Sequence, residues 1–429
     1  MPAVDLARGG GAPDVRLNGY RIAWLFALVF YFLEYLARSA PAVMVPELRA
    51  AFHLQAVQVS GIIGSYYYTY SISSLIAGAL LDRFGAKFPA PSGLALLGLG
   101  CLLFAGPNAG SAELGRLMQG AGSAFAFTSA IYLASRGFSS RALATAVGVT
   151  QCLGMLGGWI GQVGVGPLTH GVIDWRLFWV GLAVACGVLV ALLFLATPAA
   201  DPAPARTNAA ATSLLKPFGI VFSNPQSYLC GLVAGLLFVP TTVGIMIWGV
   251  SFFQLDRGYD YGVAVTTVGM TPLGWVIGCP LLGWLSDRLG RRKPVILLGA
   301  GTLLLSVLVV VVSRNLFIDG AALFAAGVGS GAAMLPYSII KEVNPDEVKG
   351  SATGVMNFLT FGISAIVGPI FAHSVGAGLV NASDRLVHFK EGAGFWCVAI
   401  VIAMAATLAL RETGHGATRK AATLTHGST

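Results

Sequence analysis

Two residues of opposite charge, Glu34 and Arg38, lie inside the first long apolar run of the sequence, which begins near Ile22. At about 1.5 Å per helical residue they would be roughly 18–24 Å from the start of that run, well inside a hydrocarbon layer about 30 Å thick. Their i, i+4 spacing places both on one face of a helix. Placing a charged residue at the centre of a transmembrane helix costs about 2.5–3.5 kcal/mol, even on the insertion scale that gives the lowest values. This face must therefore point to a partner, to water or to a substrate.

Glu34 is the one carboxylate that we expect in the middle of a span, which makes it a candidate proton carrier. Burial favours the protonated carboxyl group and Arg38 favours the charged one, so a substrate that arrives at Arg38 could shift the balance. The alternative is a permanent Glu34–Arg38 ion pair that only neutralises itself. Ionisable groups inside a membrane usually mark transport pathways, which favours the first interpretation.

The composition predicts a membrane protein. Of the 429 residues 56% are hydrophobic and 10% are charged, and the mean hydropathy is +0.77. No soluble globular class has this composition. Apolar stretches long enough to cross a bilayer recur from end to end and predict an all-α membrane protein. The twelve predicted spans are 21–46, 57–81, 88–106, 113–135, 142–168, 177–197, 227–254, 262–285, 294–313, 316–340, 350–374 and 393–411.

Positive charge is unevenly distributed between the connecting segments. If the N-terminus is cytoplasmic, the cytoplasmic segments hold most of the 26 Lys and Arg residues. The positive-inside rule therefore favours a multi-pass protein with both termini in the cytoplasm, and we expect the bacterial inner (plasma) membrane. The net charge of +8 is explained in this way and requires no nucleic-acid partner.

A polar connector divides the chain in the middle. Residues 198–216 are rich in Ala and Pro, as is typical of a flexible linker, and six predicted spans lie on each side. The sequence therefore predicts an N-terminal six-helix bundle over 1–197, a cytoplasmic linker over 198–226 and a C-terminal six-helix bundle with a cytoplasmic tail over 227–429.

Short motifs recur between the two halves at a nearly constant offset. Residues 78–83, Gly-Ala-Leu-Leu-Asp-Arg, match residues 283–288, Gly-Trp-Leu-Ser-Asp-Arg. Because each copy follows the corresponding span, the repeat indicates two bundles of the same topology.

This Gly-x-x-x-Asp-Arg pattern resembles the signature loop of the major facilitator superfamily. Residues 116–122 resemble the fourth-helix motif of the superfamily, and residues 174–178 resemble its entry to the sixth helix. The resemblance covers nearly the whole chain and implies twelve transmembrane helices in two bundles that rock about a central site. The sequence has no nucleotide-binding loop and no metal-ligand cluster, so we expect no enzyme and no cofactor, with transport driven by a proton gradient.

The repeated loop could act as a conformational latch on the cytoplasmic face. A carboxylate at a helix end lies beside an arginine in each copy, and the glycine would let helices approach closely. The alternative is an ordinary positively charged loop that sets topology. Two copies at matching places favour the latch, which would consist of Gly78, Asp82, Arg83, Gly283, Asp287 and Arg288.

Residues 35–54 resemble the first helix of the organophosphate antiporter and anion:cation symporter families. In those families the matching arginine contacts the anionic group of the substrate, and the resemblance assigns this role to Arg38. Residues 227–254 contain no charge, although the organophosphate family has a second arginine there, and Ser123 stands where the symporters often carry a glutamate. Capture of a carboxylate by Arg38 alone is therefore favoured over a phosphate clamp.

Other residues at membrane depth complete the predicted site. Tyr66 and Tyr70 are one helical turn apart and would line a cavity together, while Gln151 and Asn357 occupy equivalent positions in the two halves. These amides could instead be hydrogen-bonding links between helices. The substrate-binding candidates are Arg38, Tyr35, Tyr66, Tyr70, Gln151, Trp248 and Asn357.

Arg116 is a second candidate for proton coupling, beside Glu34. It is predicted near the outer end of the fourth helix, three residues from Glu113, so its side chain could instead snorkel to the membrane surface.

Taken together, the residues predict a secondary transporter that moves a small organic anion, a carboxylate, in symport with protons. The expected partners are this small-molecule substrate, protons and the lipid bilayer, and we expect a monomer. One alternative is a proton-coupled exporter in which Glu34 recognises a cationic or amphipathic compound. An alternative of another class is a sensor on a transporter scaffold, which binds its ligand without transport.

Overall fold

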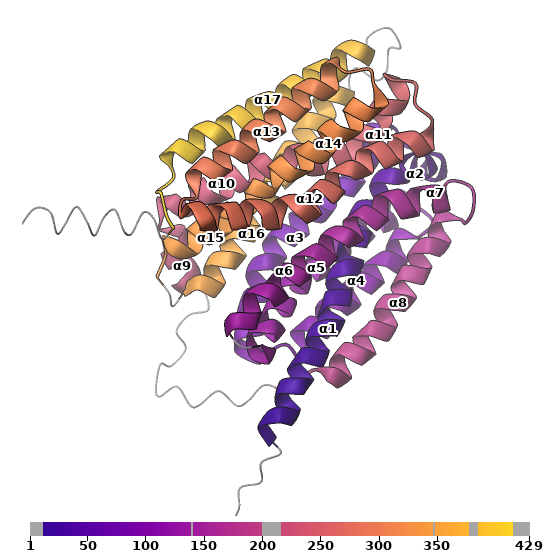
Figure 1. The fold of residues 1–429 in the computed structure, drawn as a ribbon. Helices are drawn as coiled ribbons and strands as arrows, with labels where there is room; N and C mark the ends of the chain where they lie inside the picture. Colours follow the sequence, from indigo (N-terminus) through magenta and orange to yellow (C-terminus); the bar gives the residue numbers. More distant parts are fainter. Residues whose placement is uncertain (1–11, 139, 200–215, 346–347, 377–384, 415–429) are drawn as a thin grey trace, which may run out of the picture.

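The computed structural model describes residues 12–138, 140–199, 216–345, 348–376 and 385–414. Within these ranges it leaves out the side chains of residues 12–16, 82, 140–145, 349–350, 374–376 and 385–391. All regular elements in the described ranges are helices, which confirms the all-α fold class (Figure 1).

The helices of residues 12–199, the N-terminal half, match the first six predicted spans. They are α1 (Ala12–Ser39), the 3₁₀ helix η1 (Ala40–Val43), α2 (Val45–Phe52), α3 (Ala56–Phe84), α4 (Pro89–Phe104), α5 (Ala109–Gly137), α6 (Ser140–Trp159), the π-helical η2 (Ile160–Gly164), α7 (Val165–Thr169) and α8 (Trp175–Ala196).

The helices of residues 216–414, the C-terminal half, match the other six. They are α9 (Lys216–Phe222), α10 (Pro225–Val239), the π-helical η3 (Pro240–Ile245), α11 (Met246–Leu255), α12 (Tyr261–Leu289), α13 (Lys293–Val312), α14 (Leu316–Ser330), the 3₁₀ helix η4 (Gly331–Met334), α15 (Leu335–Glu342), α16 (Lys349–Gly376) and α17 (Arg385–Ala409).

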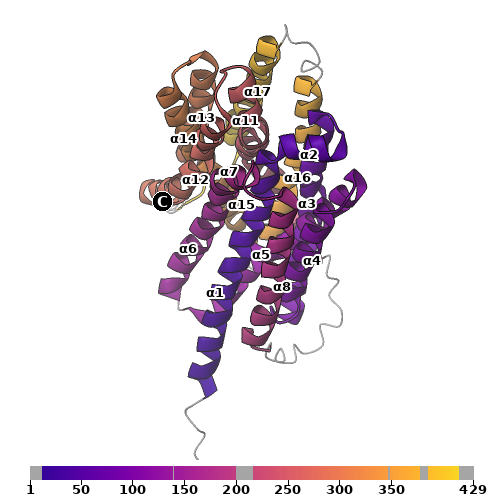
Figure 2. The same cartoon turned by 90° about the vertical axis from the view of Figure 1, so that its right-hand side faces the viewer.

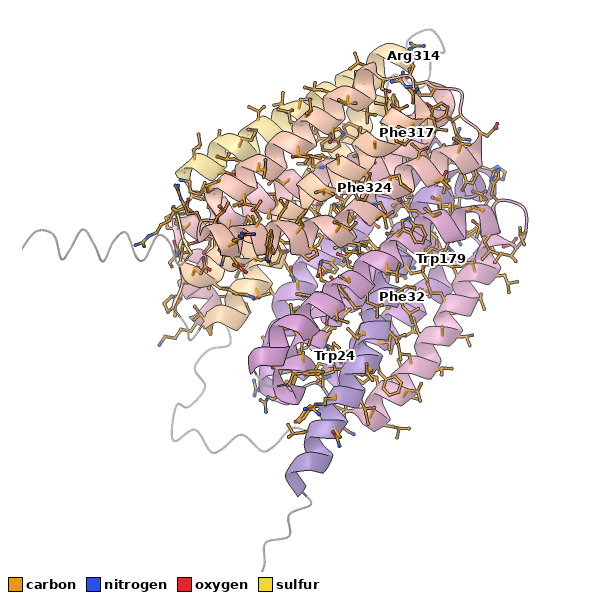
Figure 3. All side chains as sticks on the ribbon, viewed as in Figure 1. Trp24, Phe32, Trp179, Arg314, Phe317 and Phe324 are labelled. Atoms are coloured by element: carbon orange, nitrogen blue, oxygen red, sulfur yellow. The ribbon has the colours of Figure 1, made fainter. Side chains whose placement is uncertain are left out.

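Among the described residues, 8 helical stretches are both long and apolar enough to cross a membrane. The four remaining predicted spans correspond to α3, α4, α5 and the run from α6 to α7. Of these, α4 is apolar but has only 16 residues, and α5 carries Arg116 and Gln119. Apolar side chains also cover the outside, where Phe317 is 83% exposed (Figure 3), as expected for a surface that faces lipid.

Both chain ends of the described structure lie on one side of the molecule, the terminal side, where α1 begins and α17 ends. In both views α1 extends beyond its neighbours there (Figure 1 and Figure 2). The other side, the opposite side, holds α2 and α7 (Figure 1). The assignment of the terminal side to the cytoplasm stays a prediction.

The two halves of the chain occupy different parts of the molecule (Figure 1) and meet along two helix pairs. In the first pair, Ser71 of α3 donates a hydrogen bond to the carbonyl of Phe358 in α16 at 2.6 Å. In the second, Gly269 of α12 lies so close to Val163 of η2 that an added Cβ would be 2.1 Å from its methyl group. The predicted linker over 198–226 contains the short helix α9, while residues 200–215 lie outside the described residues.

Candidate functional site

The predicted first span is not one continuous helix. Pro41 lacks an N–H group, so it cannot donate to the carbonyl of Ala37, and α1 ends at Ser39. Arg38 therefore lies in the last turn of α1, at a break where the α-helix gives way to the 3₁₀ helix η1, in the last third of the predicted span 21–46.

Arg116 of α5 donates to one carbonyl that this break leaves without its helical donor, and to two further oxygens. Its Nη1 donates to the carbonyl of Ala37 at 3.0 Å and to Oε1 of Gln119 at 2.6 Å, and its Nη2 donates to the carbonyl of Ile63 at 3.2 Å. The residue is 1% exposed. The expected snorkelling of Arg116 to the membrane surface is therefore wrong, because its acceptors are carbonyls buried between α1 and α3.

Glu34 and Arg38 are in contact, as their spacing predicts. Arg38 Nη2 donates to Oε1 of Glu34, and Tyr66 of α3 joins the pair. The Tyr66 hydroxyl donates to the same carboxylate oxygen at 2.5 Å and accepts from Arg38 Nε at 3.2 Å. Glu34 is fully buried and Arg38 is 7% exposed, so the three side chains form a closed polar cluster.

Four aromatic rings surround the guanidinium of Arg38. Its central carbon is 4.4 Å from the ring centroid of Tyr35, 4.8 Å from Tyr70, 5.1 Å from Phe361 and 5.3 Å from Tyr66. Cation–π contacts of this kind contribute about 0.5–2 kcal/mol each when they are desolvated. We call this arrangement the aromatic cage of Arg38.

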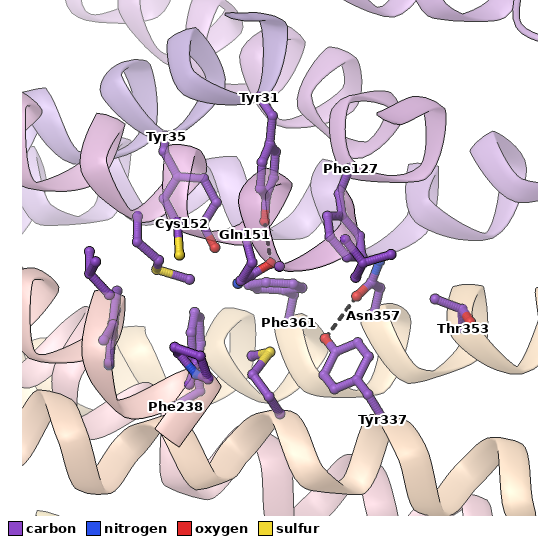
Figure 4. Close-up of a pocket in the computed structure, with 18 of the residues that line it drawn as sticks. Tyr31, Tyr35, Phe127, Gln151, Cys152, Phe238, Tyr337, Thr353, Asn357 and Phe361 are labelled. Atoms are coloured by element: carbon purple, nitrogen blue, oxygen red, sulfur yellow. Dashed lines mark hydrogen bonds between the residues drawn. The ribbon is translucent and has the colours of Figure 1, made fainter. Parts of the chain in front are cut away.

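A cavity of about 270 Å³ lies between the halves, next to the aromatic cage (Figure 4). Tyr35, Tyr70 and Phe361 line this central cavity, so they separate it from Arg38. The cavity extends toward the terminal side, where Lys341, at the end of α15, and Thr353, near the start of α16, belong to its wall. Its other lining residues are Tyr31, Phe127, Val147, Gly148, Gln151, Cys152, Met155, Phe238, Trp275, Val276, Cys279, Pro280, Met334, Tyr337 and Asn357.

The two amides predicted at equivalent positions both face this cavity. Gln151 accepts a hydrogen bond from the hydroxyl of Tyr31 at 3.3 Å, and Asn357 accepts one from Tyr337 at 2.7 Å (Figure 4). Tyr31, Tyr337 and Lys341 also line this cavity and are not among the residues predicted from the sequence. Tyr31 lies four residues before Tyr35 and therefore on the same helical face, so its place in the cavity wall could have been predicted from this spacing.

Not all predicted binding residues reach the central cavity. Tyr66 is fully buried in the Glu34–Arg38 cluster and does not line it. Trp248 lies in the C-terminal half, in a separate cavity of about 90 Å³ that Phe371 and Trp396 also line. Its ring packs against Phe371 with centroids 6.3 Å apart, so in this structure Trp248 is a packing residue.

The predicted latch differs from the structure in its details. Arg292, rather than Arg288, pairs with Asp287, at 2.6 Å, and also with Glu342 of α15 at 2.9 Å. Burial disfavours the charge of Arg292, but the hydrogen bonds to Glu342 and Asp287 outweigh it and raise the pKa of Arg292. Arg288 instead lies over the ring of Trp284.

The glycines of the repeated motif do not bring helices together. A Cβ added to Gly78 or Gly283 would meet nothing within 4 Å, so the expected close approach is absent in this conformation. Arg83 lies over the ring of Phe84, and the side chain of Asp82 lies outside the described residues.

The lysines that follow the two motif copies have the same contact in both halves. Lys87 donates to the carbonyls of Phe194 and Thr197 at the end of α8, at 3.0 and 2.9 Å. Lys293 donates to the carbonyl of Leu408 at the end of α17, at 2.7 Å. Each lysine thus places a positive charge at the negative C-terminal end of the last helix of its half.

Contacts between the halves close the opposite side. Gln162 of η2 donates to the carbonyl of Met246 in α11 at 3.1 Å. Tyr261, at the start of α12, donates to the carbonyl of Val43 in η1. The central cavity is directed toward the terminal side and shares no lining residue with a cavity of about 430 Å³ that Val43 and Tyr261 line on the opposite side, so these contacts close the path between the two.

Membrane-spanning helices in two related sets, with a buried charge cluster beside a cavity between them, define a multi-pass membrane transporter. The sequence profile of the Major Facilitator Superfamily matches residues 27–369, so the chain belongs to that superfamily. It is a transporter of this superfamily and not an enzyme.

The chain is also similar to individual proteins in sequence and in fold. The chain is 28% identical over 373 residues to the membrane sensor protein UhpC of Salmonella typhimurium, covering 79% of this chain and 80% of that protein. It is 25% identical over 356 residues to a probable 4-methylmuconolactone transporter of Cupriavidus pinatubonensis, covering 79% and 80%. A bacterial homologue of the lysosomal transporter Spinster has the same fold, with a TM-score of 0.74, 15% identity and coverage of 94% and 98%.

Proposed function

We propose that this protein is a secondary active transporter that moves a small organic anion, a carboxylate, in symport with protons by alternating access. The observation that carries the proposal is the position of Arg38. Its guanidinium lies at the break of α1, at membrane depth, behind three rings that line the central cavity. A charge retained at such a depth usually serves a transport pathway.

The lining of the central cavity suits a small anion with a planar or apolar body. Aromatic and other apolar side chains form most of the wall, and Gln151 and Asn357 offer amide groups from the two halves. Ligand sites of this type combine an apolar wall with a few polar groups that fix orientation. Among the described residues, Arg38, Arg116 and Lys341 outnumber the carboxylate of Glu34 in this region, which favours an anion over a cation.

Glu34 would couple the anion to a proton. It shares Arg38 with any carboxylate that arrives there, and a carboxyl group that loses its cation partner is more easily protonated. Loading and unloading of this proton would connect transport to the proton gradient, with no cofactor. The contacts of Arg116 favour a structural role for that residue, in which it holds the broken end of α1 in place.

Two further parts of the proposal concern the membrane and the substrate. The distribution of Lys and Arg favours a cytoplasmic terminal side, so the central cavity would face the cytoplasm, and we propose that a single chain is the transporting unit. The name of the relative from Cupriavidus pinatubonensis supports a search among small organic compounds.

The second candidate is a sensor that binds a ligand without moving it. The relative named as a membrane sensor protein, at 28% identity, favours this candidate. Such a protein would keep the cavity and the Arg38 cluster but would lose flux.

Uptake into proteoliposomes tests both candidates. A thermal-shift screen against carboxylates, sugar acids, phosphorylated metabolites and cationic drugs would first identify a ligand of the purified protein. The symport proposal expects accumulation of this labelled anion, driven by acid outside the liposomes and abolished by a protonophore. Binding with no flux would establish the sensor, and preferential binding of cations would overturn the anion proposal.

A further inference from the structure

A second, much smaller cavity lies between Arg38 and Arg116. Its volume is about 20 Å³. Tyr35, Phe238 and Trp275 line both this cavity and the central one, so they form the wall between the two. We call it the inner cavity.

Four residues that line the inner cavity carry a buried polar atom with no hydrogen-bond partner among the described residues. The atoms are Arg38 Nη1, Ser39 Oγ, Arg116 Nε and Trp275 Nε1. The residues are between 1% and 7% exposed. The three nitrogens can only donate hydrogen bonds, and the serine hydroxyl can donate as well.

The charges around the inner cavity do not balance. Glu34 pairs with Arg38, but Arg116 bonds only to neutral oxygens, those of Gln119 and of backbone carbonyls. Among the described residues the cluster therefore carries one positive charge without a carboxylate partner. Such a charge is costly to bury unless an anion accompanies it.

We propose that the inner cavity is a binding site for a monoatomic anion, with chloride as its physiological occupant. A cavity needs a volume of about 10–15 Å³ to hold one water molecule. The inner cavity therefore accepts one particle of about that size and excludes a substrate that carries a carboxylate group. A water molecule could donate its hydrogens to hydroxyl oxygens of the wall, such as those of Ser39, Tyr67 and Thr242, but it would bring no charge to offset the surplus. A halide ion can accept from donors of this kind and also compensates the surplus charge.

The site shares Arg38 with the proposed substrate site but occupies a different cavity. The organic anion would occupy the central cavity, whereas the halide would lie behind the wall of Tyr35, Phe238 and Trp275. Halide binding can therefore be measured without knowledge of the substrate, and its failure would leave the transport proposal unaffected.

The test uses the purified full-length chain in chloride-free sodium methanesulfonate, titrated with sodium chloride or bromide at constant ionic strength. A ligand that binds only the folded state raises Tm in a saturable way. We expect such a rise for both halides. We also expect a crystal grown in bromide to show an anomalous scattering peak in the inner cavity.

Ser39→Ala removes one donor with little change in shape, whereas Trp275→Phe removes one donor and also shortens the ring that separates the two cavities. Loss of one hydrogen bond to a charged group should raise the half-saturating halide concentration about tenfold. Trp396→Phe and Ser129→Ala are matched controls, because both residues are buried and lie outside the inner cavity. No saturable halide effect, or an equal effect in all four variants, would mean that the cavity holds only water. If Trp275→Phe does not fold, Ser39→Ala and the bromide peak still decide the question.

Discussion

The ring of His170 at the end of α7 stacks on the ring of Tyr261 at the start of α12, with centroids 4.1 Å apart. This contact joins the two halves on the opposite side. His170 Nδ1 also lies 2.8 Å from Oε1 of Glu47 in α2, and the Tyr261 hydroxyl donates to the carbonyl of Val43. A small group of polar contacts thus holds this side closed.

Tyr261→Phe should loosen the closed opposite side, because it keeps the stacked ring but removes the hydrogen bond to Val43. A typical hydrogen bond contributes about 0.5–1.5 kcal/mol, so the open population should rise by about two- to tenfold. Hydrogen exchange measured by mass spectrometry should be faster in α2, residues 45–52. Tyr228→Phe, on a 49% exposed tyrosine, is the control. Equal exchange in the two variants would mean that Tyr261 does not hold the closure.

Arg38→Lys should weaken binding of the organic anion by at least about tenfold, because an ammonium lacks the planar fork of the guanidinium. Titration calorimetry with the ligand from the screen measures this change. Arg314→Lys is the control, since Arg314 is exposed on the opposite side (Figure 3). Wild-type affinity in folded Arg38→Ala protein would exclude Arg38 as the anion site.

Glu34→Gln should abolish proton-driven accumulation and preserve exchange of labelled for unlabelled substrate. Gln imitates the protonated carboxyl group and keeps an oxygen that can accept from Tyr66 and Arg38. During exchange the carrier changes conformation only with substrate bound, so the substrate-free carrier does not have to return. Exchange should therefore continue in Glu34→Gln if the only role of Glu34 is to carry the proton.

Both assays for Glu34→Gln should be run on the same liposomes, with melting temperature and Glu113→Gln as controls. If Glu34 and Arg38 form a permanent ion pair with no role in coupling, the substitution leaves the buried Arg38 without a carboxylate partner. Accumulation and exchange should then both fall, together with the melting temperature. Accumulation that persists in Glu34→Gln would place the coupling group elsewhere.

Asp287→Asn should slow transport without changing substrate affinity, because neither Asp287 nor its partner Arg292 lines the central cavity. The Asp287 side chain is 69% exposed, so the pair contributes at most about 1 kcal/mol and the rate should fall no more than about fivefold. Initial rates and dissociation constants measure the two effects. Asp260→Asn, at an exposed position, is the control. Unchanged flux in both Asp287→Asn and Asp82→Asn would leave these loops only a role in topology.

Gly120→Ala should destabilise the protein by about 1–3 kcal/mol, the usual cost of overpacking. Its added Cβ would lie 2.1 Å from the carbonyl oxygen of Tyr66, so α5 and α3 must move apart. Gly148→Ala is the matched control, because its Cβ meets nothing within 4 Å and alanine favours a helix. Differential scanning fluorimetry compares the two. Equal melting temperatures of the two variants would show that α3 and α5 can move apart without loss of stability.

The sequence predicted the parts of this structure that depend on local pattern. Spans follow from the length of apolar runs, and the Glu34–Arg38 contact follows from i, i+4 geometry within one helix. The shared position of Gln151 and Asn357 at the central cavity follows from the internal repeat. The division of the chain into two bundles at 198–226 stays a prediction.

The contacts that depend on tertiary packing were not predicted. Arg116 is buried because α1 breaks at Pro41 and exposes carbonyls, and the position of these carbonyls next to α5 is set by the fold. The choice of Arg292 over Arg288 depends on Glu342, which another helix supplies. Trp248 turns away from the central cavity because Phe371 packs against it.

Phe361 closes the aromatic cage of Arg38 from the other half of the chain, whereas Tyr35, Tyr66 and Tyr70 belong to the same half as Arg38. Any movement that withdraws α16 from α1 and α3 removes one wall of the cage and admits water to the guanidinium. Hydration weakens the hold of a guanidinium on an anion, since the same charges attract less strongly in a medium of higher dielectric constant. If the proposed alternating access withdraws α16 in this way, Arg38 would hold an anion less tightly in that state than in the present one.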